Sequence, residues 1–223
     1  AQEEQRKAEM AQKAAEQEAL GSNAVAPAIK EKWENARKVD GGADEITLPN
    51  GEVVTGHYVL TESGAASASH QATNGFAETE GYPVDVNGET VNDRDYKRDA
   101  EAQQVTRGMA ADYDSRALQS PVVVSGDGVV LSGNGRTMAG EIAALNGSDA
   151  KYNAYLRGHA GKFGFTTEQV EGFEHPRVVF VPDGEMPYTS ETFAKFNQRE
   201  QKSQSRTEMA VKLGKVVDDA LFG

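Results

Sequence analysis

A short glycine-rich segment, Ser132-Gly133-Asn134-Gly135-Arg136-Thr137, separates an apolar run rich in valine from a segment rich in alanine. This order predicts a strand, a tight turn and the first turn of a helix. Glycine loses more backbone entropy on folding than any other residue, so two glycines here indicate that another group approaches the backbone closely. A helix N-terminus presents free N–H groups to an anion, and the guanidinium of Arg136 suits a phosphate.

The same segment has a second interpretation. It is not a P-loop, because no lysine follows the second glycine, and it lacks the third glycine of a dinucleotide fingerprint. Thr137 fits either a helix cap or a contact with phosphate or metal. From the residues alone, a tight structural turn in which Arg136 pairs with a nearby carboxylate is as well supported as an anion site.

The patterns on both sides of the turn predict an α/β or α+β fold with a small mixed sheet flanked by helices. We expect a helical extension over residues 1–44, a domain over residues 45–215 and a C-terminal tail over residues 216–223. Hairpins are expected at Asn50-Gly51 and at Ser125-Gly126-Asp127-Gly128. The segment over residues 175–182 is predicted to be a buried strand. Helices are expected over residues 1–20, 27–38, 99–114, 137–145, 149–158 and after Thr166, with a final pair near the C-terminus.

Some details of these elements are also predicted. Gly41-Gly42 should end the second helix, and Ala102, Val105 and Met109 should face inward from the helix over residues 99–114. Residues 61–95 have a loop-like composition, and a segment of this length inside a domain is often functional.

Composition excludes several classes of protein. The chain has no cysteine, so disulfides, thiol nucleophiles and cysteine–zinc sites are absent. The net charge of −12 argues against strong unspecific binding to nucleic acid, although a local basic site remains compatible with it. No apolar run reaches the ~20 residues of a membrane-spanning helix. The chain begins Ala1-Gln2-Glu3 and is expected to be a piece of a longer soluble protein.

Other polar residues are candidates for the same site. His70 follows Ser69, but no nucleophile elbow is present, so a contact within a loop is favoured over a catalytic triad. Asp93, Arg94 and Asp95 fit a solvated charge cluster. Alternatively, the Asp93 carboxylate could hold Mg²⁺, which prefers oxygen ligands, and Arg94 could contact a second phosphate.

The segment "VVVSGDGVVLSGNGRTMA" resembles the signature of the ParB/sulfiredoxin superfamily, in which a Gly-x-x-Arg turn after a strand opens the nucleotide-binding helix. More narrowly, it is similar to the DdrB-like ParB domain of multidomain polyvalent proteins from phages and conjugative elements. The likeness extends over about residues 50–215 and includes "FAKFNQREQKSQSRTEMA". It implies nucleotide contacts for Asn197 and Arg199, a metal contact for Asn197, and a cytoplasmic location in a bacterial or phage-infected cell.

The chain also departs from this superfamily. Sulfiredoxins carry a catalytic cysteine in the turn, where this chain has Asn134, so reduction of oxidised thiols is excluded. ParB turns usually carry charged residues where this one has Asn134 and Gly135, which leaves the nucleotide preference open. No helix-turn-helix segment that would read DNA is evident before Gly223.

Two functional hypotheses follow. In the first, the domain binds a nucleoside triphosphate or a DNA phosphate and hydrolyses it, as an NTPase or nuclease. Arg136 then neutralises charge, and Asp93 activates water through Mg²⁺. In the second, it binds nucleotide or DNA without turnover, beside other domains of a larger mobile-element protein. A further alternative is a non-catalytic module that interacts with nucleic acid or protein and has a vestigial nucleotide pocket. The sequence specifies neither the oligomeric state nor the ligand base.

Overall fold

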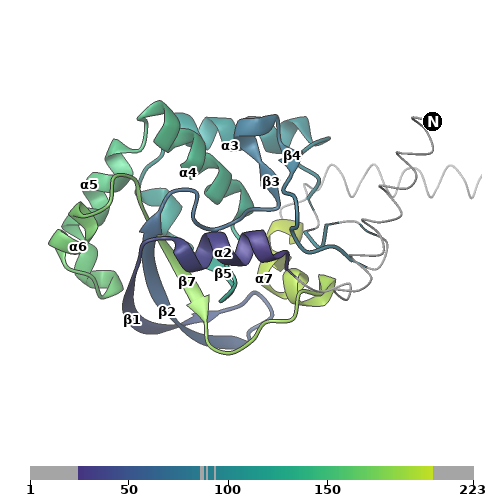
Figure 1. Cartoon of the computed structure of the whole chain (residues 1–223), viewed down its shortest axis with the longest axis horizontal. Coiled ribbons are helices and arrows are strands. Elements are labelled where there is room, and N and C mark those ends of the chain that lie inside the picture. The colour runs from purple at the N-terminus through teal and green to yellow at the C-terminus, as the bar shows by residue number, and fades with distance from the viewer. Residues whose placement is uncertain (1–24, 86–87, 89, 93, 203–223) are drawn as a thin grey trace, which may run out of the picture.

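The computed structural model describes residues 25–85, 88, 90–92 and 94–202, and for residues 198–202 it describes the backbone alone. A mixed five-stranded sheet lies at its centre (Figure 1). The order of its strands is β1 (Lys38–Thr47), β2 (Val53–Glu62), β7 (Pro176–Pro182), β5 (Val122–Val124) and β6 (Val130–Ser132). The short strands β3 (His70–Gln71) and β4 (Ala77–Glu78) form a separate pair.

Helices surround the sheet. They are α2 (Pro27–Asn35), α3 (Ala100–Ala111), α4 (Asn134–Asn146), α5 (Ala150–Gly158), α6 (Thr167–Glu171) and α7 (Ser190–Lys202), with the 3₁₀ turns η1 (Ala72–Asn74), η2 (Ser115–Leu118) and η3 (Ala160–Phe163). Figure 1 shows α2 lying across the sheet, with α5 and α6 at one end of the molecule and α7 at the other. No helix in the described part of the chain has the length and apolar character needed to cross a membrane.

Strand pairing confirms the predicted mixed sheet. β5 runs parallel to β7, whereas β1–β2, β2–β7 and β5–β6 are antiparallel. Both predicted hairpins are present: Gly51 takes a φ of 89° between β1 and β2, and Gly128 takes a φ of 86° between β5 and β6. These left-handed conformations favour glycine, which is why the turns could be read from the sequence.

The region from residue 27 to residue 47 differs from the prediction. The helix α2 ends at Asn35, and β1 begins at Lys38, so Gly41-Gly42 lies inside a strand. The pairing of β1 with β2 shifts register between Asp40 and Ala43, as at a bulge. A side chain at Gly41 would collide with the backbone carbonyl of Phe163. These glycines therefore let η3 pack on the strand, and the expected domain boundary at residue 45 falls inside β1.

The helix α2 is part of the core. Ile29 is 4% exposed and Trp33 5%. Trp33 packs among valines of the sheet, including Val124 and Val130, and a side chain at Gly128 would collide with it. The turn between β5 and β6 therefore fits directly beneath α2.

Two further predictions have different outcomes. In α3, Ala102 is buried and Met109 is partly buried, as expected, but Val105 is 56% exposed, so its predicted inward position was wrong. The helix predicted over residues 1–20 and the last helix of the C-terminal pair lie outside the described residues.

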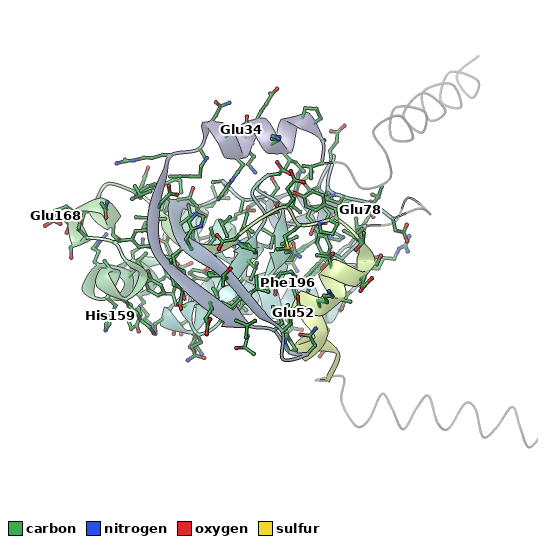
Figure 2. All side chains as sticks on the ribbon, turned by 90° about the horizontal axis from the view of Figure 1, so that it is seen from below. Glu34, Glu52, Glu78, His159, Glu168 and Phe196 are labelled. Atoms are coloured by element: carbon green, nitrogen blue, oxygen red, sulfur yellow. The ribbon has the colours of Figure 1, made fainter. Side chains whose placement is uncertain are left out.

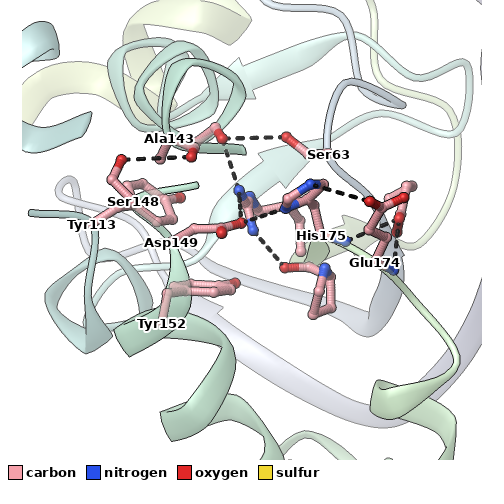
Figure 3. Close-up of polar contacts among 12 residues, drawn as sticks. Ser63, Tyr113, Ala143, Ser148, Asp149, Tyr152, Glu174 and His175 are labelled. Atoms are coloured by element: carbon pink, nitrogen blue, oxygen red, sulfur yellow. Dashed lines mark hydrogen bonds and ion pairs between the residues drawn. The ribbon is translucent and has the colours of Figure 1, made fainter. Parts of the chain in front are cut away.

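A buried ion pair joins β7 to the start of α5 (Figure 3). Arg177 Nη2 donates to Asp149 Oδ2 over 2.9 Å, and His175 Nδ1 lies 3.0 Å from the same oxygen. Arg177 also donates to the carbonyls of Pro176 and Gly140. Burial alone would raise the pKa of Asp149, but Arg177 and His175 outweigh it and hold that pKa below its usual value.

Candidate functional site

A cavity of about 570 Å³ lies between the tip of the β1–β2 hairpin, the glycine turn and α7. Figure 2 shows Glu52 of the hairpin beside Phe196 of α7, and Glu52 forms an ion pair with Lys195 of the same helix. The residues lining the cavity are Ile46, Thr47, Leu48, Pro49, Met109, Gln119, Ser120, Pro121, Val123, Ser132, Arg136, Phe196 and Asn197. Its volume is within the usual range for a small-molecule site.

The cavity contains Arg136, which the sequence singled out. The helix α4 starts at Asn134, and Gly133 at its N-cap takes a φ of 93° and provides no side chain as a cap. Arg136 is therefore in the first turn, where the helix end favours negative charge. It is the one charged residue among the described residues that line this cavity. In a chain with a net charge of −12, this wall of the cavity is suited to an anion.

A second cavity, of about 360 Å³, shares part of that wall. Arg136 and Met109 line both cavities. The other residues around the second cavity are Val105, Gly108, Asp112, Asp114, Arg116 and Ala117. Val105 thus lines a cavity and is not in the core, which agrees with its exposed position.

Two other predicted residues, Ser132 and Asn197, also line the larger cavity. Ser132 Oγ donates to the carbonyl of Phe196 over 3.4 Å and so links β6 to α7. Asn197 Nδ2 donates to the carbonyls of Leu131 and Phe193. Since a carboxamide has two N–H donors, these bonds use both, and a ligand contact from Asn197 would involve its Oδ1 oxygen.

The two glycines of the turn are explained by groups of the protein itself. A methyl group at Gly133 would lie 3.1 Å from Arg136 Nη2, so the guanidinium folds back over this residue. A methyl group at Gly135 would lie 3.1 Å from the hydroxyl of Tyr96. The close approach expected from the sequence is therefore present, but the approaching groups are side chains of the protein: Val122, at 3.0 Å, and Arg136 at Gly133, and Tyr96 at Gly135.

Asn134 and Thr137 face other parts of the molecule. Asn134 is 4% exposed; its Oδ1 accepts from the backbone N–H of Ser69 over 2.7 Å, and its Nδ2 donates to Asn92 Oδ1. Thr137 donates its hydroxyl to the carbonyl of Gly133 and lines a separate cavity of about 30 Å³. Asn134 thus joins the loops around Ser69 and Asn92 to the start of α4.

His70 and Arg94 lie around the ring of Tyr96 and line neither cavity of Arg136. Ser69 Oγ is 3.0 Å from His70 Nδ1, and Asp95 Oδ1 is 3.8 Å from His70 Nε2. These three residues have the composition of a hydrolase triad, but Ser69 is 0% exposed and His70 2%. Ser69 is therefore buried, as the preference for a contact within a loop anticipated, and the ligand contacts expected of His70 and Arg94 stay predictions.

The burial of His70 predicts a pH dependence. Burial lowers the pKa of His70, and the nearby Asp95 and Glu78 only partly offset it. The unfolded chain takes up this proton near pH 6.5, so this contribution to stability is present above about pH 6.5 and is lost as the pH falls toward the folded pKa. Burial also raises the pKa of Glu141 to about 7. The contribution of this carboxyl group to stability therefore increases as the pH falls below about 7, opposite to that of His70.

The measurement is therefore a comparison of variants by urea unfolding at pH 7.5 and pH 5.5. His70→Gln should lower the free energy of unfolding at both pH values. Its free energy of unfolding should fall less from pH 7.5 to pH 5.5 than that of the wild type. His159→Gln, which removes an exposed histidine, should keep the wild-type difference. An unchanged pH dependence in His70→Gln would show that His70 is not held neutral by burial.

The structure does not test the predicted roles of Asp93 and Arg199 or the metal contact of Asn197. Asp93, expected to bind Mg²⁺ and activate water, and the side chain of Arg199 lie outside the described residues. Among the residues that are described, no group of three or more His, Asp or Glu side chains is arranged to hold a metal ion. The metal contact expected of Asn197 stays a prediction.

The sequence did not indicate much of the cavity wall. The hairpin tip, residues 46–49, comes from a distant part of the chain, and Gln119, Ser120 and Pro121 precede β5. The polar Gln119-Ser120 pair before an apolar strand was a usable signal. Because β5 and β6 are antiparallel, the residues before β5 lie at the same end of the hairpin as the polar turn that follows β6. Phe196 was not selected either, although it precedes the predicted Asn197.

Comparison with known families gives one match. The model of the ddrB-like ParB superfamily domain matches residues 49–183, more than half of the chain. The match includes the glycine turn and ends before α7, so it is shorter than the expected likeness over residues 50–215. Neither the curated proteins nor the solved structures gave a match. The chain belongs to the ddrB-like ParB superfamily.

Proposed function

We propose that this domain binds a nucleotide in the cavity lined by Arg136, with the nucleotide phosphate at the guanidinium and the first turn of α4. The observation that carries the proposal is the position of Arg136: it is in the first turn of a helix that no side chain caps, in a cavity whose described walls contain no carboxylate. A guanidinium offers a planar fork of donors that matches phosphate oxygens.

The rest of the cavity supports a nucleoside. Apolar side chains such as Leu48, Pro121 and Phe196 offer flat or aliphatic surface to a base, while Gln119 and Asn197 offer amide groups to its polar edge. Sites for small ligands commonly combine apolar walls with a few polar groups that fix orientation. The expected partners are therefore a nucleoside triphosphate or a nucleotide of DNA.

The proposal is one of binding without turnover. Hydrolysis would need a base close to the phosphate. No described residue in the wall of this cavity is a carboxylate or histidine, and the two aspartates of the adjoining cavity, Asp112 and Asp114, are paired with Arg116 and Lys151. The likeness of "SGNGRTMA" to polyvalent proteins supports a place for this domain in a larger protein of a phage or conjugative element, where other domains would supply catalysis.

Thermal unfolding with a panel of ligands tests the proposal. ATP, ADP, CTP, GTP and a short DNA are each added with and without Mg²⁺, with inorganic phosphate at equal ionic strength as the control. A ligand at about 100 times its Kd stabilises the folded chain by about 2.7 kcal/mol, which raises the melting temperature by on the order of 5–10 °C for a domain of this size. No increase with any nucleotide or with DNA would contradict it.

A further inference from the structure

The two cavities of Arg136 adjoin each other along one edge. Arg136 and Met109 are in the walls of both, and residues 114–117 of the second cavity continue along the chain into residues 119–121 of the first. Arg136 therefore borders two spaces, one of about 570 Å³ and one of about 360 Å³. Each volume lies within the range of small-ligand sites, ~300–1,000 Å³.

The second cavity is lined by both charged and apolar residues. Asp114 accepts two bonds from Arg116, through the backbone N–H and Nε. Asp112 pairs with Arg116 Nη2 over 3.2 Å and with Lys151 Nζ over 2.6 Å. Negative and positive groups are therefore matched here, which disfavours a second phosphate and suits an uncharged, hydroxyl-rich group. A carboxylate has about four acceptor positions, so both aspartates can also accept from ribose hydroxyls.

The apolar residues of the second cavity offer surface to a base. Val105 is 56% exposed, an unusual position for a valine in the middle of a helix, and it lies in the wall together with Met109 and Ala117. Gly108 opens the space between these side chains, because a methyl group built on it meets no other atom within 4 Å. This cavity therefore has the chemistry of a nucleoside site, as the larger cavity does.

We propose that the domain binds a dinucleotide unit, two nucleosides joined by one phosphate, with the phosphate at Arg136 and one nucleoside in each cavity. This inference rests on the proposed function and extends it from a mononucleotide to a ligand that occupies both cavities. One charged donor group at the junction matches one linking phosphate, and the charge balance of the second cavity matches a neutral nucleoside.

Gly108→Leu tests the inference, because it puts a large side chain on a residue that lines the second cavity, at a position where a Cβ meets no other atom within 4 Å, and it replaces a helical glycine by a better helix former. The matched control is Gly158→Leu, at the exposed end of α5, where a methyl group also meets no other atom. Titration calorimetry measures the affinity of each protein for nucleoside 5′-monophosphates and for ribodinucleoside monophosphates of the same bases.

The wild type and Gly158→Leu should bind the dinucleoside monophosphate at least tenfold more tightly than the mononucleotide. Gly108→Leu should bind both equally, at the wild-type affinity for the mononucleotide. If the mononucleotide binds and the dinucleotide binds no more tightly, or if Gly108→Leu leaves the difference intact, the inference is overturned and the proposed function stands. If neither ligand binds to the wild type, the inference fails, and the thermal unfolding panel decides separately whether the proposed function fails with it.

The dinucleotide unit could be a free molecule or a step within a single strand, and a ten-nucleotide single strand of the same base separates these sources. Equal or tighter binding of the strand, lost in Gly108→Leu, assigns the site to single-stranded nucleic acid. Binding of the dinucleotide with at least tenfold weaker binding of the strand assigns it to free dinucleotides. Either result supports the inference that two nucleosides bind on either side of Arg136.

Discussion

Arg177→Met is expected to lower the free energy of unfolding by about 3–5 kcal/mol, because it leaves the buried carboxylate of Asp149 without its main partner. The side chains of Arg177 and Asp149 are 10% and 4% exposed. The guanidinium also lies 5.0 Å from the ring of Tyr113 and 5.1 Å from that of Tyr152, and both contacts are lost. Urea unfolding at pH 7 measures the change.

Two further variants separate the buried charge from lost packing. In Arg177→Met/Asp149→Asn the orphaned charge is removed, so the double variant should lose less stability than the two single variants added together. Arg98→Met removes an exposed arginine that pairs with Asp95 and should change stability far less, since exposed ion pairs contribute little. A loss in Arg177→Met no larger than in Arg98→Met would contradict the account of this ion pair.

Trp33→Ala is also expected to lower the free energy of unfolding by about 3–5 kcal/mol, because it creates a large cavity between α2 and the sheet. Trp33 is 5% exposed and packs against β5 and β6, and the glycine turn directly follows β6. The matched control is Leu145→Ala, which shortens a side chain that is 74% exposed and should change stability by less than about 0.5 kcal/mol. Equal stability of the two variants would show that α2 is an appendage of the domain.

The sequence predicted the elements whose signals are local. The hairpin turns depend on Gly51 and Gly128, which take positive φ angles, and the helix after the glycine turn depends on residues next to it in the chain. Gly41-Gly42 shows where this reasoning fails. Two glycines after a helix indicate its end, but here they permit close packing of η3 from a distant segment, and no local pattern carries that information.

For the candidate site, too, the sequence predicted what local signals carry and missed what depends on packing between distant segments. Arg136 and Ser132 were found because they belong to one short motif. Asn134 belongs to that motif too, yet it bonds to Ser69 and Asn92 inside the fold, and only three-dimensional packing decides this. The second cavity was missed for a related reason: the helical pattern of α3 predicted that Val105 faces the core, but the side chain borders a cavity.

Titration calorimetry on Arg136 variants tests the central claim most directly, with the nucleotide that stabilises the wild type most. Arg136→Ala should weaken binding at least tenfold, about 1.4 kcal/mol, and Arg136→Lys should weaken it partly, because lysine keeps the charge but loses the planar fork. Arg157→Ala, an exposed arginine of α5 that lines neither cavity, should bind as the wild type does. Unchanged affinity in Arg136→Ala, together with a large fall in its melting temperature, would contradict the claim and assign the glycine turn to the fold alone.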